Sequence, residues 1–428
     1  MLKVHHTQRY LSIDGKPFYW LGDTAWHLFH RLTFDEAVRY LNDRAAKGFT
    51  VIQAVILCEY DGFKPNVNGD VIFDAMDVSK PNSAYFKHID RVMDAAAKLG
   101  LYMALIPVWG DKVGTGFWGE GPTHFINEQN ARDYGKFIGA RYRDYPVIWM
   151  NGGDRPADGN EHIWNALAEG LKEGDKDTHL MTYHPCGGRS SSEWFHNTDW
   201  LDFNMLQTAH QIHANTYTPI AVDYSRTPAK PCIVGECGYE DHPSAGGEIY
   251  IDDYYVRMGA YWSVFSGAFG NTYGCHDIWQ FYDPKRYKPI NRVRTPWYDA
   301  LDFPGASQMA HLKSLMLSHP FFERIPDQSI IGDNQKASGL PHVRATRDGT
   351  KGKSDASYIM AYFAAPASVG IRTNVIASKK IRCRWYDPRN GTYRDAGVID
   401  NSGEPMFSPP STWRETDWVL VLDKANGQ

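Results

Sequence analysis

The run YPVIWMNGGD, residues 145–154, has the pattern of a buried parallel strand that ends in a sharp turn. Its apolar residues are too few for a helix of ordinary length, and consecutive apolar residues are typical of a strand that is covered on both faces. Gly152 and Gly153 allow the backbone to bend sharply after the strand. We therefore expect Asp154 to lie just beyond the carboxyl end of a strand.

A second run, PCIVGE at residues 231–236, repeats this order of apolar residues, glycine and acid. If both strands belong to one (β/α)₈ barrel, their carboxyl ends open onto the same face, where barrel enzymes have their active sites. Asp154 and Glu236 are therefore our candidate catalytic pair. The alternative for each acid alone is structural, since Asp154 would cap the following helix and Glu236 would pair with a nearby arginine. The presence of such acids at two strand ends favours a function.

Strand and helix patterns alternate along residues 18–325. Thr33 and Glu36 have the spacing of a capping box, which predicts the start of a helix that runs to Gly48. Eight strands separated by helices are what a (β/α)₈ TIM barrel needs, and the two acids follow the fourth and seventh strands. The expected strands are 18–21, 51–57, 102–108, the run that ends at 154, 179–183, 201–206, 231–236 and a run that ends at 270–276. The expected helices are 33–48, 83–99, 128–142, 161–172, 254–266 and 306–317.

Two further segments flank this barrel. Asp14-Gly15 is a turn pair between alternating apolar and polar positions, so residues 1–17 are expected to form a hairpin lid over one end of the barrel. Short strand-like runs alternate with turn residues in residues 326–428, which is typical of a small all-β sandwich. These runs are 342–346, 358–363, 381–386 and 418–422. We therefore predict an α/β fold, a (β/α)₈ TIM barrel followed by a small β-sandwich.

The composition indicates a neutral partner. The chain of 428 residues has a formal net charge of −5, and its acids and bases are interleaved, so we expect binding neither to nucleic acid nor to an anionic membrane. Aromatic residues make up 14% of the chain, and aromatic rings can stack on the apolar C–H faces of sugars. Most of these rings still belong to ordinary packing. We expect a small-molecule or oligosaccharide substrate, and the oligomeric state stays open.

The cysteines and the amino-terminal residues indicate in which cellular compartment the protein is expected. Six cysteines are scattered without the paired spacing of a metal site, so free thiols are expected. The segment MLKVHHTQRYLSIDG, residues 1–15, has no apolar stretch of the kind found in secretory signals, and no run of about 20 apolar residues occurs. A cytoplasmic chain is the expectation, although a secreted chain whose signal has been removed would look the same.

Two carboxyl groups at one site suit the hydrolysis of glycosidic bonds. One must be protonated to release the leaving oxygen, and the other must be ionised to attack the anomeric carbon or to activate water. Surroundings decide these roles, because a carboxyl that is buried beside apolar groups or another acid keeps its proton to higher pH. We assign Asp154 as the general acid/base and Glu236 as the nucleophile. Their separation is expected to be about 5–5.5 Å for a retaining enzyme and about 6.5–9.5 Å for an inverting one.

Several motifs give the chain a resemblance to the apiosidase-like glycoside hydrolases over most of residues 7–320. They are GDTAW (22–26), NGGD (151–154), HP (184–185) with SSEWFH (191–196), LDFNMLQTAH (201–210), the pair Gly235-Glu236 and NTYGCHDIWQF (271–281). The resemblance implies a retaining barrel enzyme whose acid/base is Asp154 and whose nucleophile is Glu236. It also implies β-apiose as the released sugar, and a carboxyl-terminal β module of a kind called collagen-binding by analogy.

Other side chains at or just beyond the expected strand ends are candidates for contact with the substrate. Asn151 or Gln207 would hold a sugar hydroxyl beside the reacting carbon, where hydrogen bonds strengthen in the transition state. Each candidate also has a structural alternative, since a lone histidine is often a satisfied loop residue and a tryptophan can plug the barrel mouth. The candidates are Asp23, Trp109, Asn151, His184, Gln207, Tyr239, Tyr273, His276 and Trp279.

We expect neither a catalytic metal nor a cofactor. Metal-dependent barrel hydrolases usually have paired histidines at the end of the first strand, where this chain has GDTAW at residues 22–26. The leading hypothesis is a retaining glycoside hydrolase that removes a terminal, apiose-like sugar from a plant glycan or glycoside. The alternatives are an enzyme of the same mechanism with another pentose or hexose, and a carbohydrate-binding barrel that has lost catalysis. The intact pair of acids argues against the last of these.

Overall fold

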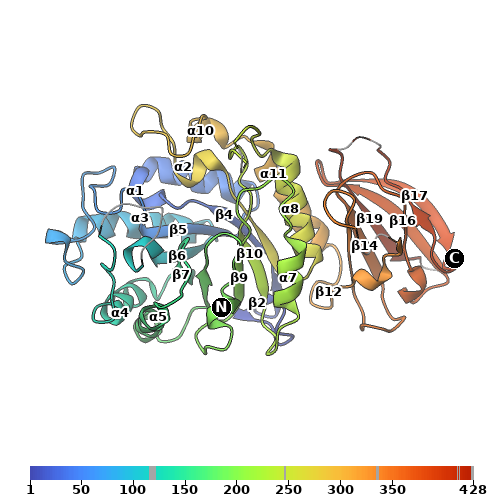
Figure 1. Cartoon of the computed structure of the whole chain (residues 1–428), viewed down its shortest axis with the longest axis horizontal. Helices are drawn as coiled ribbons and strands as arrows, with labels where there is room; N and C mark the ends of the chain where they lie inside the picture. The colour runs from blue at the N-terminus through green and yellow to red at the C-terminus, as the bar shows by residue number, and fades with distance from the viewer. Residues whose placement is uncertain (115–121, 245–246, 334–336, 412, 414, 426–428) are drawn as a thin grey trace.

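The computed structural model describes residues 1–114, 122–244, 247–333, 337–411, 413 and 415–425. Figure 1 shows two bodies, a barrel of strands and helices from blue to yellow along the chain and a smaller β domain in orange and red. In the part of the chain that is described, no helix is both long and apolar enough to span a membrane.

Eight parallel strands of the described chain form the barrel. In chain order they are β4 (Trp20–Thr24), β5 (Val51–Leu57), β6 (Tyr102–Val108), β7 (Val147–Gly152), β8 (Met181–His184), β9 (Asn204–Gln207), β10 (Cys232–Glu236) and β11 (Gly270–Tyr273). Six lie in one sheet in the order β11-β4-β5-β6-β7-β8, and β9 pairs with β10. β8 lies beside β9 and β10 beside β11, so the strands go round in a ring. The expected barrel is confirmed, with the two acids at its fourth and seventh strands.

Helices cover the outside of this ring (Figure 1). The longer ones are α2 (Phe34–Ala46), α3 (Ser83–Lys98), α4 (Ala131–Tyr142), α5 (Glu161–Asp175), α7 (Tyr217–Tyr224), α8 (Asp253–Phe265) and α11 (Pro304–Leu317). The expected capping box of α2 is present, because the Thr33 hydroxyl accepts from the Glu36 backbone and the Glu36 carboxylate accepts from the Thr33 backbone. The sequence predicted no helix at α7. Pro219 interrupts its helical pattern, but proline is tolerated in a first turn.

The amino-terminal segment is a three-stranded antiparallel sheet of β1 (Leu2–Val4), β2 (Leu11–Ile13) and β3 (Lys16–Phe18). The turn between β2 and β3 lies at Asp14 and Gly15, with φ values of 51° and 75°. Phe18 packs on Tyr102, the first residue of β6, with ring centroids 5.2 Å apart, so the sheet lies at the amino ends of the barrel strands. Residues 16–18 belong to this sheet, and the first barrel strand therefore spans Trp20–Thr24 instead of the expected 18–21.

The carboxyl-terminal domain is built on a six-stranded antiparallel sheet in the order β12-β13-β14-β19-β16-β17, with β15 and β18 as a separate pair. Its apolar core is its own and includes Ile330, Ile371 and Leu420. The expected strands 342–346, 358–363, 381–386 and 418–422 each overlap one of the observed strands. The strands are β12 (Ile325–Pro326), β13 (Val343–Arg347), β14 (Tyr358–Phe363), β15 (Val369–Gly370), β16 (Lys380–Asp387), β17 (Thr392–Asp400), β18 (Met406–Phe407) and β19 (Trp418–Lys424).

The β domain packs against the outside of α8 (Figure 1). Arg257 of α8 is 1% exposed, and its Nη2 atom lies 3.0 Å from Oδ1 of Asp417. The ring of Tyr261 stacks on that of Tyr362, with centroids 4.8 Å apart. These contacts lie in the helix layer of the barrel and not at the carboxyl ends of its strands, where the candidate site is located.

Candidate active site

Asp154 reaches the barrel mouth through a left-handed turn. β7 ends at Gly152, and Gly152, Gly153 and Asp154 have φ values of 92°, 116° and 52°. A Cβ atom on Gly153 would lie 2.6 Å from the indole of Trp109, and one on Gly152 would lie 2.3 Å from the backbone oxygen of His184. At residues 152 and 153, only glycine fits these φ values together with such close neighbours. The two glycines therefore place the Asp154 carboxyl group above the end of the strand.

Glu236 is the last residue of β10, and its side chain is buried between two histidines. Its Oε1 atom lies 3.2 Å from Nε2 of His210, and its Oε2 atom lies 3.2 Å from Nε2 of His184. The His184 contact has ion-pair distance but not the angle of a hydrogen bond. Burial alone raises the pKa of Glu236, but the contacts with both histidines outweigh burial and hold the pKa well below its ordinary value. Glu236 is therefore ionised at neutral pH.

Asp154 lies in different surroundings from Glu236. Burial raises the pKa of Asp154, the negative charge of Glu236 raises it further, and the result is about 6. Nε2 of Gln207 donates to Oδ1 of Asp154 over 2.8 Å and partly opposes this shift. Two neighbouring carboxyl groups whose pKa values are driven apart form the acid and the base of one reaction. Asp154 suits the acid and Glu236 suits the nucleophile.

The two carboxyl groups lie close together. One oxygen of Asp154, one oxygen of Glu236 and one ring nitrogen of His184 all lie within 4.8 Å of one another. Such a group has donor types that also occur in metal sites. The same group also contains the two carboxyl groups that acid–base hydrolysis of a glycoside needs, and that reaction uses no metal.

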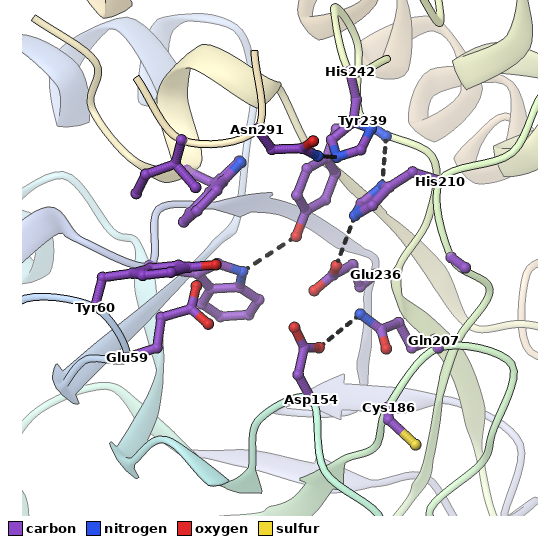
Figure 2. Close-up of a pocket in the computed structure, with 15 residues that line it drawn as sticks. Glu59, Tyr60, Asp154, Cys186, Gln207, His210, Glu236, Tyr239, His242 and Asn291 are labelled. Carbon is purple, nitrogen blue, oxygen red and sulfur yellow. Dashed lines mark hydrogen bonds and ion pairs between the residues drawn. The ribbon is translucent and has the colours of Figure 1, made fainter. Parts of the chain in front are cut away.

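A pocket of about 300 Å³ opens above this pair (Figure 2). Aromatic rings form much of its wall, and Nε1 of Trp26 donates to the Tyr239 hydroxyl over 3.2 Å. Such walls pack on the C–H faces of sugars, while polar edges meet the hydroxyl groups. The pocket is lined by Trp26, Glu59, Tyr60, Asp154, Cys186, Gly187, Gln207, Ala209, His210, Glu236, Tyr239, His242, Trp279, Ile290 and Asn291.

Three of the expected substrate contacts, Gln207, Tyr239 and Trp279, line this pocket together with the two acids. Gln207 ends β9 and donates to Asp154, so it lies next to one of the two candidate catalytic carboxyl groups. Trp279 belongs to the short helix α9 (His276–Trp279) that follows β11.

Three others lie directly behind the lining residues. His184 is buried against Glu236. Trp109 packs edge-on against Trp26, with ring centroids 5.2 Å apart. His276 accepts a hydrogen bond from Nε1 of Trp279 over 3.1 Å. These three side chains position pocket residues and are not among the residues that line it.

Asp23, Asn151 and Tyr273 do not reach the pocket. Asp23 accepts from the Tyr40 hydroxyl and from Nε of Arg44, each over 2.5 Å, on the helix side of the strand. Tyr273 is paired in register with Asp23, so it faces the same way, and its hydroxyl donates to Glu240 over 2.5 Å. Neighbouring positions along a strand point to opposite sides, so lying at a strand end does not decide which side a residue faces.

Asn151 is fully buried within β7, where its Nδ2 atom lies 3.8 Å from the sulfur of Met181. Gly152 and Gly153 follow Asn151, and Asp154 is the first residue after them that lines the pocket. Of the two residues expected to contact a sugar hydroxyl, Gln207 lines the pocket and Asn151 does not.

Besides Gly187, Ala209 and Ile290, seven lining residues were not among the sequence candidates. Trp26 belongs to the GDTAW motif, Glu59 and Tyr60 follow β5 directly, and His210 ends the LDFNMLQTAH motif, so strand-end position would have found these four. His242 and Asn291 lie on loops without a strand pattern nearby. Cys186 lies at the edge of the pocket, as expected of some of the thiols, and all six cysteines are free.

The assignment of Asp23 to the barrel wall predicts a loss of stability. Asp23→Asn is expected to lower the free energy of unfolding by about 3 kcal/mol, because Arg44 then keeps a buried charge without its main partner. Urea unfolding of this variant and of the exposed control Glu128→Gln measures the difference. The turnover of folded Asp23→Asn should stay close to that of the wild type. A lost turnover with unchanged stability would instead place Asp23 in the site.

The fold and the site together define a class of protein. A (β/α)₈ barrel that brings two carboxyl groups together in a pocket with aromatic walls, at the carboxyl ends of its strands, has the groups that the hydrolysis of a glycosidic bond needs. The chain belongs to the apiosidase-like family, because the family model described as "Apiosidase-like, catalytic domain" matches residues 5–323. A second model, described as "Putative collagen-binding domain of a collagenase", matches residues 325–423. The family expected from the motifs is thus confirmed.

Solved structures agree with this family. The chain is similar to a protein titled "Glycoside hydrolase", with 35% identity, a TM-score of 0.91, and coverage of 100% of this chain and 97% of that one. It is also similar to a glycoside hydrolase family 5 protein from Bacteroides vulgatus ATCC 8482, with 34% identity, a TM-score of 0.89, and coverage of 99% and 93%. Comparison with curated protein sequences gave no match.

Proposed function

We propose that this glycoside hydrolase works with retention of configuration and releases a terminal, apiose-like sugar from a plant glycan or glycoside. One observation supports the mechanism above all: an oxygen of Asp154 lies within 4.8 Å of an oxygen of Glu236. Retaining enzymes keep their carboxyl groups about 5–5.5 Å apart, whereas inverting enzymes need about 6.5–9.5 Å to admit a water molecule.

In the first step of the proposed reaction, the Glu236 carboxylate attacks the anomeric carbon while Asp154 gives its proton to the leaving oxygen. The glycosidic bond breaks and a covalent bond forms between the sugar and Glu236. In the second step, Asp154 removes a proton from a water molecule, which attacks the anomeric carbon and releases Glu236. His184 and His210 keep Glu236 ionised for the first step and stabilise the carboxylate that the second step releases.

Two observations support a small terminal sugar. The pocket volume of about 300 Å³ is at the lower end of the range for ligand pockets, about 300–1,000 Å³. The family model is named for an apiosidase, and apiose is a five-carbon sugar. A pocket of this size accepts one terminal residue more readily than the middle of a polymer.

A panel of aryl glycosides tests the substrate, with the β-apioside beside pentosides and hexosides. The β-apioside should give the highest kcat/KM. Proton NMR of the first product tests the mechanism, since retention predicts that the β-anomer forms before mutarotation. A first product of the α configuration would overturn retention, and turnover of another sugar alone would replace apiose within the same mechanism.

The pKa values predict the pH dependence of kcat/KM. The active form has Asp154 protonated and Glu236 ionised, so kcat/KM should fall as the pH rises through about 6, where Asp154 loses its proton. The acid limb should lie well below the ordinary pKa of a glutamate, because the histidines lower the pKa of Glu236. Initial rates at low substrate concentration across this range measure both limbs. A kcat/KM that rises with pH above about 7 would contradict Asp154 as the acid.

A further inference from the structure

A third carboxyl group, that of Glu59, lines the pocket, and the hydrolysis of the bond does not use it. Glu59 lies just beyond β5, and its residue is 6% exposed. Figure 2 shows its carboxyl group pointing into the pocket, on the side opposite to His210 and Gln207, with Asp154 between them. A buried acid that points into a substrate pocket without a part in bond breaking suggests a part in binding.

The loop that presents Glu59 is fixed by buried contacts. Nζ of Lys112 donates to the backbone oxygen of Glu59 over 2.7 Å, and Lys112 is fully buried and paired with Asp111. Two residues after Glu59, Asp61 pairs with Arg31 over 2.7 Å. Side chains that bind substrates specifically are held in place by such supporting contacts. Glu59 is therefore positioned before a ligand arrives.

The surroundings of Glu59 favour its neutral form. Burial raises the pKa of Glu59 well above its ordinary value, and the negative charges of Asp154, Asp111 and Glu236 raise it further. A protonated carboxyl group donates one hydrogen bond and accepts others, as a sugar hydroxyl does. A third negative charge, by contrast, would oppose the ionised Glu236 across the pocket.

The neighbours of Glu59 in the pocket wall are aromatic. Tyr60 follows it in the chain, and the ring centroid of Tyr60 lies 6.4 Å from that of Trp279, which also lines the pocket together with Trp26. A sugar whose C–H face packs on these rings presents its hydroxyl groups at the edges of the ring. Among the described lining residues, Glu59 is the acidic side chain on this side of the pocket that can meet such an edge.

We propose that Glu59 binds a hydroxyl group of the terminal sugar in the pocket and so selects sugars that have a hydroxyl at that position. This proposal rests on the proposed function, and it adds the residue that discriminates among sugars. It follows from the place of Glu59 among the aromatic side chains and across from the catalytic pair. A site that is built to bond a hydroxyl rejects the analogue without it, because its own polar group then lacks a partner.

The test uses the full chain, the aryl glycoside that the wild type hydrolyses best, and analogues of it that each lack one hydroxyl. Glu59→Ala is expected to lower kcat/KM for the full substrate about 10- to 100-fold. Glu59→Gln keeps a donor and an acceptor at the same length and should recover most of that loss. For the analogue that lacks the bonded hydroxyl, Glu59→Ala and the wild type should have similar kcat/KM values.

Two controls separate binding from folding and from catalysis. Glu128→Ala removes an exposed glutamate and should match the wild type, and melting temperatures report on folding. If Glu59→Ala is unfolded, Glu59→Leu fills the same space without polar atoms and replaces it. The fall of kcat/KM through about pH 6 should persist in the Glu59 variants, since it belongs to Asp154.

The outcomes are distinct. Folded Glu59→Ala or Glu59→Leu with wild-type kcat/KM, or with an equal loss on every deoxy analogue, overturns the role of Glu59 and leaves the proposed function intact. If kcat/KM of these variants no longer falls as the pH rises through about 6, the role of Glu59 in binding is also overturned, because Glu59 would then be the general acid. A wild-type chain that hydrolyses no glycoside overturns the proposed function and this inference together.

Discussion

Glu236→Gln is expected to lower kcat by at least about 10³-fold while the protein stays folded. The amide has the size of the carboxyl group, but it is a poor nucleophile and has no negative charge to stabilise the positive charge at the anomeric carbon. The residue lies at the end of β10 between His184 and His210, so no other described side chain takes its position at the pair. Steady-state rates and thermal unfolding of the wild type and of Glu236→Gln measure the effect on turnover and on folding.

A smaller variant makes this test specific for a nucleophile. Glu236→Ala leaves a space beside the anomeric carbon, and added azide should enter it and restore turnover of an activated aryl glycoside. Azide then attacks once, so its glycosyl azide should have the configuration opposite to that of the substrate. Full activity of Glu236→Gln, or a glycosyl azide of unchanged configuration from Glu236→Ala, would remove Glu236 from this role.

The barrel could be predicted because its strands are covered on both faces. Such strands appear in the sequence as short apolar runs, and the acids that follow them, Asp154 and Glu236, are next to glycines that mark the strand ends. The main error lay at the first strand, where Phe18 continues an apolar run into Trp20. Hydrogen bonds to β2 assign residues 16–18 to the amino-terminal sheet instead. Such pairing is a long-range property that local sequence does not contain.

The substrate contacts were harder to predict than the acids. Asp23 and Trp26 belong to the same GDTAW motif, yet Asp23 faces Arg44 in the helix layer while Trp26 lines the pocket. Which way a strand-end residue faces depends on the exact residue at which the strand ends, and one residue of error turns it to the other side. His242 and Asn291 come together from two long loops, with Nδ2 of Asn291 3.0 Å from Nε2 of His242. No spacing in the sequence predicts that meeting.

The second large effect is expected for Asp154→Ala, and it should depend on the leaving group. For a substrate with an alkyl leaving group, kcat/KM should fall about 10²- to 10⁴-fold, because the departing alkoxide needs the proton that Asp154 supplies. The leaving group of a dinitrophenyl glycoside departs as a stable dinitrophenolate anion that needs no proton. The rate at which this substrate forms the glycosyl-enzyme should therefore fall far less.

With the dinitrophenyl glycoside, Asp154→Ala should mainly slow the second step, in which Asp154 acts as the base that removes a proton from water. Azide needs no base, so it should restore turnover of the dinitrophenyl glycoside and give a glycosyl azide of unchanged configuration, the opposite of the Glu236→Ala product. Asp154→Asn, which keeps the contact with Gln207, is the control for lost packing. An equal fall of kcat/KM for both leaving groups would show that Asp154 positions the substrate instead of moving a proton. The opposite pKa shifts of Asp154 and Glu236 would then not reflect the roles of acid and nucleophile.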